Sequence, residues 1–216
     1  MQVKSTLVIA LAALGVTSQA ASLYDFELDN PSNAVSGQTK FASKGAGQNV
    51  TINIGSGNDS VFAGVMNNTW NGDTFKMMCI EIEQHASSSN ATYVREDLEG
   101  QLGFLVSNIG TAMTNVQAAG LQVAIWETVY DHTGMGDFAA NLSTGNFKLV
   151  NNNDVRAAAM NWLTGVGESN DGNYFRFSNN HKQDYVMANP VPEPATMLAL
   201  SAGVSMLIAR RRRKNS

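Results

Sequence analysis

The chain contains two regions in which apolar residues are spaced differently. In the first, three segments alternate apolar and polar positions and are rich in β-branched and aromatic residues: 49–55, 60–66 and 73–83. The stretches GSGNDS and NNTWNGD, which separate these segments, are rich in the turn-forming residues Gly, Asn and Asp. This alternation predicts strands joined by tight turns, and therefore an antiparallel sheet or sandwich.

Helical spacing follows in the second region. A first helix is predicted by apolar residues that stop at Gly110: Leu98, Leu102, Leu105, Val106 and Ile109. A second is predicted from the capping-box sequence TNVQ, beginning at Thr114, to about Tyr130, and a third over residues 153–166. Short strands return in YFRF and QDYVM. The predicted class is α+β, an antiparallel β-sandwich or sheet with a helical insertion of about three helices.

Residues 1–20 have the pattern of a secretory signal peptide. Lys4 precedes an apolar run from Leu7 to Val16, and small residues suited to cleavage continue to Ala20. The run is shorter than the roughly 20 residues that a membrane-spanning helix needs. We therefore expect secretion into an oxidising compartment, with one folded domain over residues 21–189.

The last segment, residues 190–216, contains three elements in a fixed order. They are a Pro-Glu-Pro sequence, a short apolar stretch and a basic end: Pro192, Glu193 and Pro194; Ala195 to Ala209; Arg210 to Lys214. A basic tail of this kind stays on the cytoplasmic side while the apolar stretch associates with the membrane. The segment resembles the PEP-CTERM sorting signal of Gram-negative bacteria. The resemblance implies transient membrane association, removal of the tail by an exosortase-type enzyme, and delivery to the cell surface or extracellular matrix.

The part of the chain between these two ends is acidic. Six of the 14 Lys and Arg residues and one of the 18 acidic residues lie in the ends: Lys4, Arg210 to Arg213, Lys214 and Glu193. Residues 21–189 therefore hold 8 basic and 17 acidic residues, a formal charge of −9. This charge argues against nucleic acid as a partner, because such binding needs a basic face.

Two polar residues interrupt the apolar pattern. Cys79, the only cysteine, lies on the expected strand 74–84, on the face opposite Met78 and Ile80. Gln122 lies in the middle of the apolar stripe of the second expected helix, where a buried amide without partners would cost about 1 to 3 kcal/mol. A buried, inert thiol and a glutamine at the edge of the stripe are the plain interpretations.

The surrounding sequences favour a chemical role for this pair. MCIEIE and LQVAIWE resemble the two signatures of the Cys-Gln thioester domain of bacterial surface adhesins, the second being a TQxA-type motif. Cys79 and Gln122 match the bonding residues, Trp126 matches the tryptophan of the second signature, and Gln101 matches an intermediate motif. Leu121 departs from the pattern, which usually has Thr at that position.

The resemblance implies that the Cys79 thiol and the Gln122 carboxamide form a thioester and release ammonia. A thioester acylates nucleophiles more readily than an amide does, and a rigid fold supplies the proximity that its formation needs. Trp126, Met77 and Phe75 are expected to exclude water. An amine or hydroxyl on a surface or matrix polymer then attacks the Gln122 carbonyl. This chemistry predicts a single-use adhesin or matrix cross-linker, not a turnover enzyme, and it requires no cofactor.

Several alternatives remain open. Cys79 with His85 or His132 suggests a cysteine hydrolase or transglutaminase, although no motif of those families surrounds them, and the histidines have no metal-ligand spacing. Aromatic residues for a sugar-binding face are available, with core packing the expected use: Trp70, Trp162 and Tyr174. The principal alternative is a non-covalent structural protein of the exopolysaccharide or biofilm matrix with an inert cysteine. A further hypothesis is that lysine is scarce in residues 21–189 to limit self-reaction: Lys40, Lys44, Lys76, Lys148 and Lys182.

Overall fold

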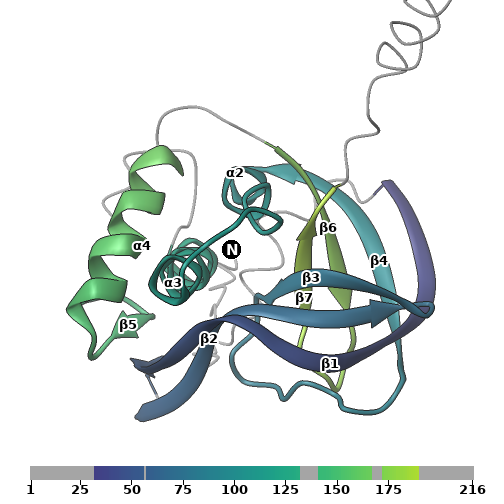
Figure 1. The fold of residues 1–216 in the computed structure, drawn as a ribbon, viewed down its shortest axis with the longest axis horizontal. Coiled ribbons are helices and arrows are strands. Elements are labelled where there is room, and N and C mark those ends of the chain that lie inside the picture. The colour runs from purple at the N-terminus through teal and green to yellow at the C-terminus, as the bar shows by residue number, and fades with distance from the viewer. Residues whose placement is uncertain (1–31, 56, 132–140, 167–171, 190–216) are drawn as a thin grey trace, which may run out of the picture.

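The computed structural model describes residues 32–55, 57–131, 141–166 and 172–189 (Figure 1). The predicted class is confirmed, because these residues form an antiparallel sheet with three helices. In chain order the elements are β1 (Ser32–Asn53), β2 (Asn58–Trp70), β3 (Asp73–Cys79), β4 (Ala91–Gly100), α2 (Leu102–Val106), α3 (Asn115–Asp131), β5 (Lys148–Leu149), α4 (Asn153–Val166), β6 (Gly172–Ser178) and β7 (Tyr185–Ala188).

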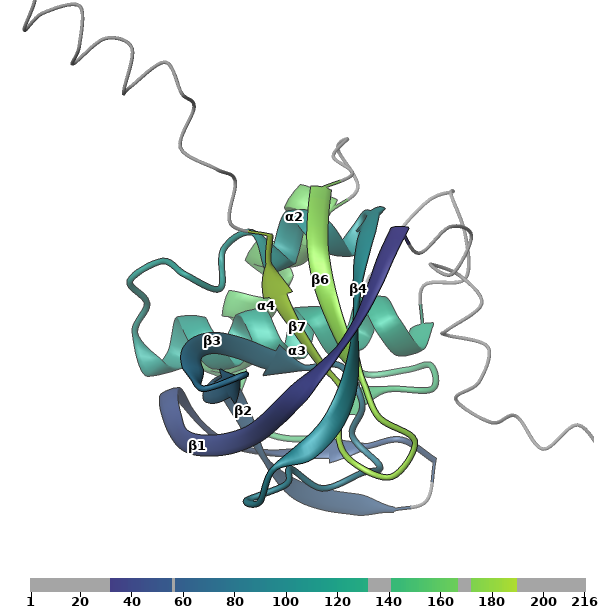
Figure 2. The same cartoon turned by 90° about the vertical axis from the view of Figure 1, so that its right-hand side faces the viewer.

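The sheet closes on itself through the long strand β1. The strand order is β2-β3-β7-β6-β4-β1-β5, and β1 also pairs with β2. The first part of β1, up to Thr39, pairs with β4, and the part from Thr39 to Asn53 pairs with β2. Figure 2 shows β1 crossing from β4 and curving away from it. Six of the strands therefore enclose a barrel-like core, and β5 is attached to the far end of β1.

A pair of glycines permits the close crossing of β1 and β2. Gly47 and Gly64 are directly paired, with φ angles of +154° and +149°. A Cβ atom on Gly64 would lie 2.4 Å from the carbonyl oxygen of Ala46. The register of the pair shifts between Lys44 and Gly47, as in a β-bulge. Glycine is required here because any side chain would meet the opposite backbone and strain the chain.

The helices form an insertion, as the sequence predicts. All three lie in the chain between β4 and β6, two strands that pair with each other from Val94 to Gly100. In Figure 1, α3 lies between α4 and the strands. Every residue of α3 from Ala118 to Thr128 is buried, as expected of a helix covered on both sides. A Cβ atom on Gly120 would lie 2.5 Å from the Cβ atom of Ala158, so α3 and α4 approach closely at this glycine.

Two predicted boundaries are wrong. Leu98 belongs to strand β4, and the first helix is only α2, five residues long. The spacing of four from Leu98 to Leu102 fits one face of either a strand or a helix, which explains the error. The strand expected over residues 74–84 ends at Cys79. Beyond it, the Ile80 N–H still donates to the Asp184 carbonyl in the β3–β7 register, whereas the Ile82 N–H donates to the Tyr130 hydroxyl and leaves the ladder.

The predicted terminal segments, residues 1–20 and 190–216, lie outside the described residues. Among the helices that the structure describes, none is both long enough and apolar enough to cross a membrane.

Candidate functional site

The fold brings the end of strand β3 against the middle of helix α3. Cys79 is the last residue of β3, which pairs with β2 on one side and β7 on the other. Gln122 lies in α3, which begins with the predicted capping box. The Gln117 N–H donates to the Thr114 hydroxyl at 3.2 Å, and the Thr114 N–H donates to the Gln117 side chain at 2.9 Å. Both side chains therefore project from hydrogen-bonded elements.

Cys79 and Gln122 are in direct contact and fully buried. Their exposed fractions are 1% and 0%. The Sγ atom of Cys79 lies 3.6 Å from Oε1 of Gln122. The backbone N–H of Cys79 donates to the same oxygen at 3.2 Å, and Nε2 of Gln122 donates to the backbone carbonyl of Cys79 at 2.7 Å. The carboxamide is thus held at both ends beside the thiol.

Burial controls the protonation of this thiol. The pKa of Cys79 is raised to about 12, chiefly because burial removes water from the thiol. The Trp126 indole and the Cys79 backbone oppose this rise, and the Glu81 carboxylate adds to it. The indole N–H of Trp126 is buried and makes no hydrogen bond of ordinary geometry, so it opposes the effect of burial only in part. At neutral pH, Cys79 is therefore a protonated thiol and not a free thiolate.

The arrangement provides a donor for an oxyanion on the Gln122 carbonyl. When a nucleophile attacks a carboxamide, negative charge develops on its oxygen, and a fixed N–H donor stabilises that charge. The backbone N–H of Cys79 already donates to Oε1. The sequence does not identify this donor, because it is a backbone group and depends on the three-dimensional contact.

The segment that follows Cys79 is held by residues of helix α3 and of the turn between β6 and β7. The Ile80 N–H donates to the Asp184 carbonyl at 3.1 Å, and the Ile82 N–H donates to the Tyr130 hydroxyl at 3.1 Å. The Gln183 side chain donates to the Glu81 carbonyl at 2.9 Å. These bonds fix the chain as it leaves the strand, so the position of Cys79 is defined on both sides.

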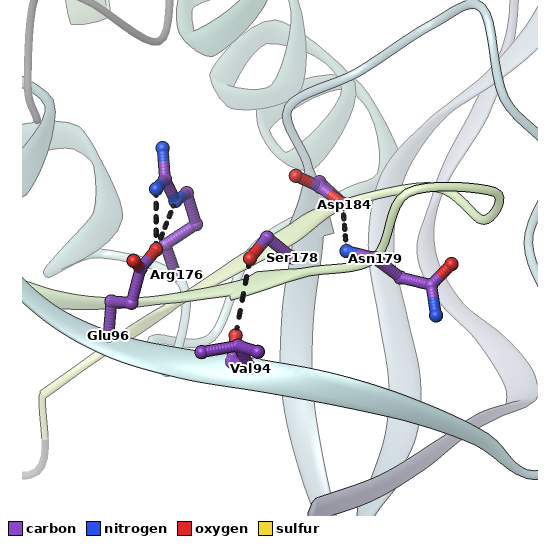
Figure 3. A network of polar contacts seen from close by, with 6 residues as sticks. All are labelled: Val94, Glu96, Arg176, Ser178, Asn179 and Asp184. Atoms are coloured by element: carbon purple, nitrogen blue, oxygen red, sulfur yellow. Dashed lines mark hydrogen bonds and ion pairs between the residues drawn. The ribbon is translucent and has the colours of Figure 1, made fainter. Parts of the chain in front are cut away.

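The turn that carries Asp184 is itself anchored, as Figure 3 shows. The Asn179 N–H donates to the Asp184 carboxylate at 2.8 Å across the turn between β6 and β7. On β6, Arg176 forms an ion pair with Glu96 of β4, with Nε 2.9 Å from the carboxylate. The ion pair therefore links β4 to β6, and the Asn179 bond steadies the turn whose Asp184 carbonyl accepts from Ile80, next to the cysteine.

A cavity of about 330 Å³ adjoins the pair. Cys79 and Trp126 line it, together with the polar side chains of Lys44 and Gln183. The rest of the lining is apolar: Phe41, Val61, Phe62, Met66, Ile82 and Ala86. The cavity offers a largely apolar route to the sulfur atom, along which little water can be held by hydrogen bonds.

Only one of the four residues predicted to support the pair lines the cavity. Trp126 lines the cavity, whereas Met77, Phe75 and Gln101 do not. Met77 is fully buried, with its sulfur 3.7 Å from the Asn68 amide, and Phe75 is half-buried against the core. Gln101 is the residue before α2, and its side-chain oxygen is buried without a hydrogen bond.

Among the described residues, the side chains of the alternative sites are not brought together. His85 is exposed, and His132 lies outside the described ranges. Tyr174 is fully buried, so it cannot form a sugar-binding surface with Trp70 and Trp162. In the described part of the chain, no group of three or more His, Cys, Asp or Glu side chains is arranged to hold a metal ion.

Three residues near the pair were not identified from sequence. Tyr130 lies one helical turn after Trp126, and this spacing was the available signal for it. Lys44 and Phe62 come from strands β1 and β2, and they reach the cavity only because of the strand register. No local pattern distinguishes Lys44 from the other lysines.

Comparison with known proteins identifies the C-terminal segment. Residues 190–214 match the PEP-CTERM protein-sorting motif, which includes the predicted Pro192, Glu193 and Pro194. No curated protein and no solved structure matches the chain. The chain is therefore a secreted or cell-surface protein of a Gram-negative bacterium, carrying a sorting signal for an exosortase-type enzyme.

Proposed function

We propose that this secreted protein attaches covalently to a partner through an internal thioester between Cys79 and Gln122. The observation that carries the proposal is the contact of the two side chains, with Sγ 3.6 Å from Oε1 and both residues buried. The resemblance of MCIEIE and LQVAIWE to the thioester-domain signatures supports the same pair. The partner is an amine- or hydroxyl-bearing polymer of the surface or matrix, and the biological role is adhesion or matrix cross-linking.

Thioester formation replaces the C–N bond of the Gln122 carboxamide with a C–S bond. The sulfur of Cys79 attacks Cδ of Gln122, and the thiol proton passes to the carboxamide. The C–S bond forms, the C–N bond breaks, and ammonia carries away the transferred proton. The Cys79 N–H stabilises the charge on Oε1. Because the thiol pKa is about 12, the reaction depends on the enforced contact and not on a free thiolate.

The second step uses the cavity. A nucleophile entering it meets Cys79, which lines the cavity and whose sulfur is the leaving group of the thioester to Gln122. Attack forms an amide or ester to the Gln122 side chain and returns the thiol. Since the original carboxamide is not regenerated, each molecule reacts once, which distinguishes this protein from a turnover enzyme.

The test uses methylamine and the secreted protein as it is isolated. Fresh protein is incubated with isotopically labelled methylamine, denatured and digested, and each glutamine-containing peptide is examined by mass spectrometry. We expect the label on Gln122 in the wild type and not in Cys79→Ala, which retains Gln122 but has no thiol. Gln117, which lies on the same helix in the capping box, is the internal control and remains unlabelled.

One result would contradict the proposal. That result is fresh protein that yields Gln122 as an unmodified glutamine while Cys79 in the same sample is fully alkylated after denaturation. Unmodified here means neither labelled, nor hydrolysed to glutamate, nor linked to a lysine. Equal labelling of Gln122 in Cys79→Ala would also contradict it, because the label would not depend on the sulfur.

A non-covalent structural protein of the matrix is the second candidate function. It is favoured by the satisfied hydrogen bonds of the Gln122 carboxamide and by the burial that keeps Cys79 protonated. In that case the pair is a packing and hydrogen-bonding contact alone. The methylamine experiment separates the two candidates.

A further inference from the structure

Lys44 is directed toward the same cavity as Cys79 by the strand register. Lys44 of β1 pairs with Met66 of β2, which pairs with Met77 of β3. Directly opposed residues in an antiparallel sheet share a face, and Cys79, two residues beyond Met77, shares it too. Consistent with this register, Lys44, Met66 and Cys79 all line the cavity.

Lys44 differs in this respect from every other lysine of the described residues. The remaining four do not line the cavity: Lys40, Lys76, Lys148 and Lys182. Two strand spacings, about 10 Å, separate the backbone of Lys44 from that of β3. The flexible four-carbon stem of lysine covers much of this distance. Among the described lysines, Lys44 is thus the primary amine that shares a cavity with Cys79.

The ammonium group of Lys44 is held at the aromatic wall of the cavity. Its Nζ atom lies 4.6 Å from the centre of the Phe62 ring, a cation–π contact. Phe62 lines the same cavity, and Lys44 is otherwise exposed. This contact holds the side chain of Lys44 at the wall of the cavity that Cys79 also lines.

We propose that Lys44 is an internal acceptor for the acyl group of Gln122, a proposal that rests on the thioester function. Lys44 first gives its ammonium proton to water, and the free amine then attacks the Gln122 acyl carbon. A C–N bond forms, the C–S bond breaks, and the proton lost by the nitrogen passes to the Cys79 sulfur. The products are a Lys44–Gln122 isopeptide bond and a free Cys79 thiol.

Self-capture limits the lifetime of the reactive protein. A molecule that meets no partner closes the bond between β1 and α3 and can no longer attach to anything. The two elements are already neighbours, because the Gly47 N–H donates to the Asn115 side chain at 3.2 Å. The isopeptide bond therefore joins segments that the fold holds together, and the spent protein carries an internal cross-link in place of a bond to a partner.

The experiment follows the secreted protein over time, with and without methylamine. Trypsin does not cleave after a modified lysine, so self-capture joins peptide 41–76 to peptide 96–148, while Cys79 lies in peptide 77–95. In wild type aged without amine, we expect this linked pair, lighter than its parts by one ammonia, with Cys79 alkylated. Lys44→Arg keeps the cation but loses the linked pair, and its methylamine-reactive state persists longer. Lys40→Arg, at an exposed lysine of the same strand, is the matched control and forms the linked pair at the wild-type rate.

The outcomes distinguish this inference from the function on which it rests. Methylamine labelling of Gln122 in fresh wild type, with no linked pair and the same decay of reactivity in Lys44→Arg, would overturn the role of Lys44 and retain the thioester. Absence of both labelling and linkage would overturn both. A further supporting result is faster linkage in Phe62→Leu, because this substitution releases the Lys44 ammonium from the ring.

Discussion

The Gln122 carboxamide continues the hydrogen-bond ladder at Cys79 where the pairing of β3 with β2 ends. The β2–β3 ladder ends at the pair Met66 and Met77, two residues before Cys79. The carboxamide then accepts from the Cys79 N–H and donates to the Cys79 carbonyl. A side chain therefore supplies the two bonds that another strand residue would have provided, and its carbonyl group lies beside the thiol as a result.

Loss of the Gln122 hydrogen bonds should destabilise the fold even when no thioester can form. In a Cys79→Ala background, we expect Gln122→Met to lower the free energy of unfolding by about 2 to 4 kcal/mol, because two buried backbone groups lose their partners. Urea unfolding measures the difference. Gln38→Met, at an exposed glutamine of β1, is the control and should cost less than about 1 kcal/mol. Equal costs at the two sites would show that the buried pairing contributes nothing.

The sequence is sufficient to predict the site elements that depend on local signals. Thr114 and Gln117 occur in a capping-box pattern, and they form both expected bonds at the start of α3. Cys79 and Gln122 stand out in the sequence because each is polar within an apolar pattern and because their surroundings resemble known signatures. These signals require only neighbouring residues, so one sequence is enough to find them.

The rest of the site depends on long-range pairing that one sequence does not specify. Lys44 reaches the cavity through the register of three strands and through a shift between Lys44 and Gly47. The closure of the sheet depends on β1 pairing with two strands on different parts of its length. Register is set by the total packing of the faces, and a shift of one residue would turn Lys44 to the other side.

Tyr130 should control local opening of the chain next to Cys79. Tyr130→Phe removes the hydroxyl that accepts the Ile82 N–H, and so leaves that half-buried donor without its partner. We expect hydrogen exchange at the Ile82 amide to accelerate by about tenfold, equivalent to about 1.4 kcal/mol. Exchange at the Ile125 amide, in the buried middle of α3, is the internal reference. If Ile82 and Ile125 accelerate together, the substitution has lowered global stability instead.

Gly120 should be required for the close packing of α3 on α4. Gly120→Ala places a Cβ atom 2.5 Å from that of Ala158 and 2.9 Å from its carbonyl carbon. We expect a loss of about 1 to 3 kcal/mol from overpacking, despite the better helix propensity of alanine. Thermal or urea unfolding measures the change. Adding Ala158→Gly should recover about 1 kcal/mol of the loss, and a purely additive double variant would contradict the contact.

Glu127 should make the fold less stable as pH rises toward neutrality. Burial raises the pKa of Glu127 to about 7, with Asp131 adding to the increase and Arg156 and the Asn141 N–H opposing it. The unfolded chain releases this proton near pH 4.5, the ordinary glutamate value, whereas the folded protein retains it until about pH 7. Between these values the folded state binds more protons, so stability falls with rising pH, by up to about 3 kcal/mol from this group.

Glu127→Gln tests this dependence because it keeps an oxygen for the Asn141 N–H and carries no charge at any pH. We expect the variant to unfold at higher urea than the wild type above about pH 7. The difference should shrink as pH falls from about 7 and level off below about 4.5, where the wild-type carboxyl is protonated in both states. Glu99→Gln, at an exposed carboxylate of β4, controls for the change in net charge. A difference between Glu127→Gln and wild type that stays constant over this range would show that Glu127 ionises equally in the folded and unfolded states.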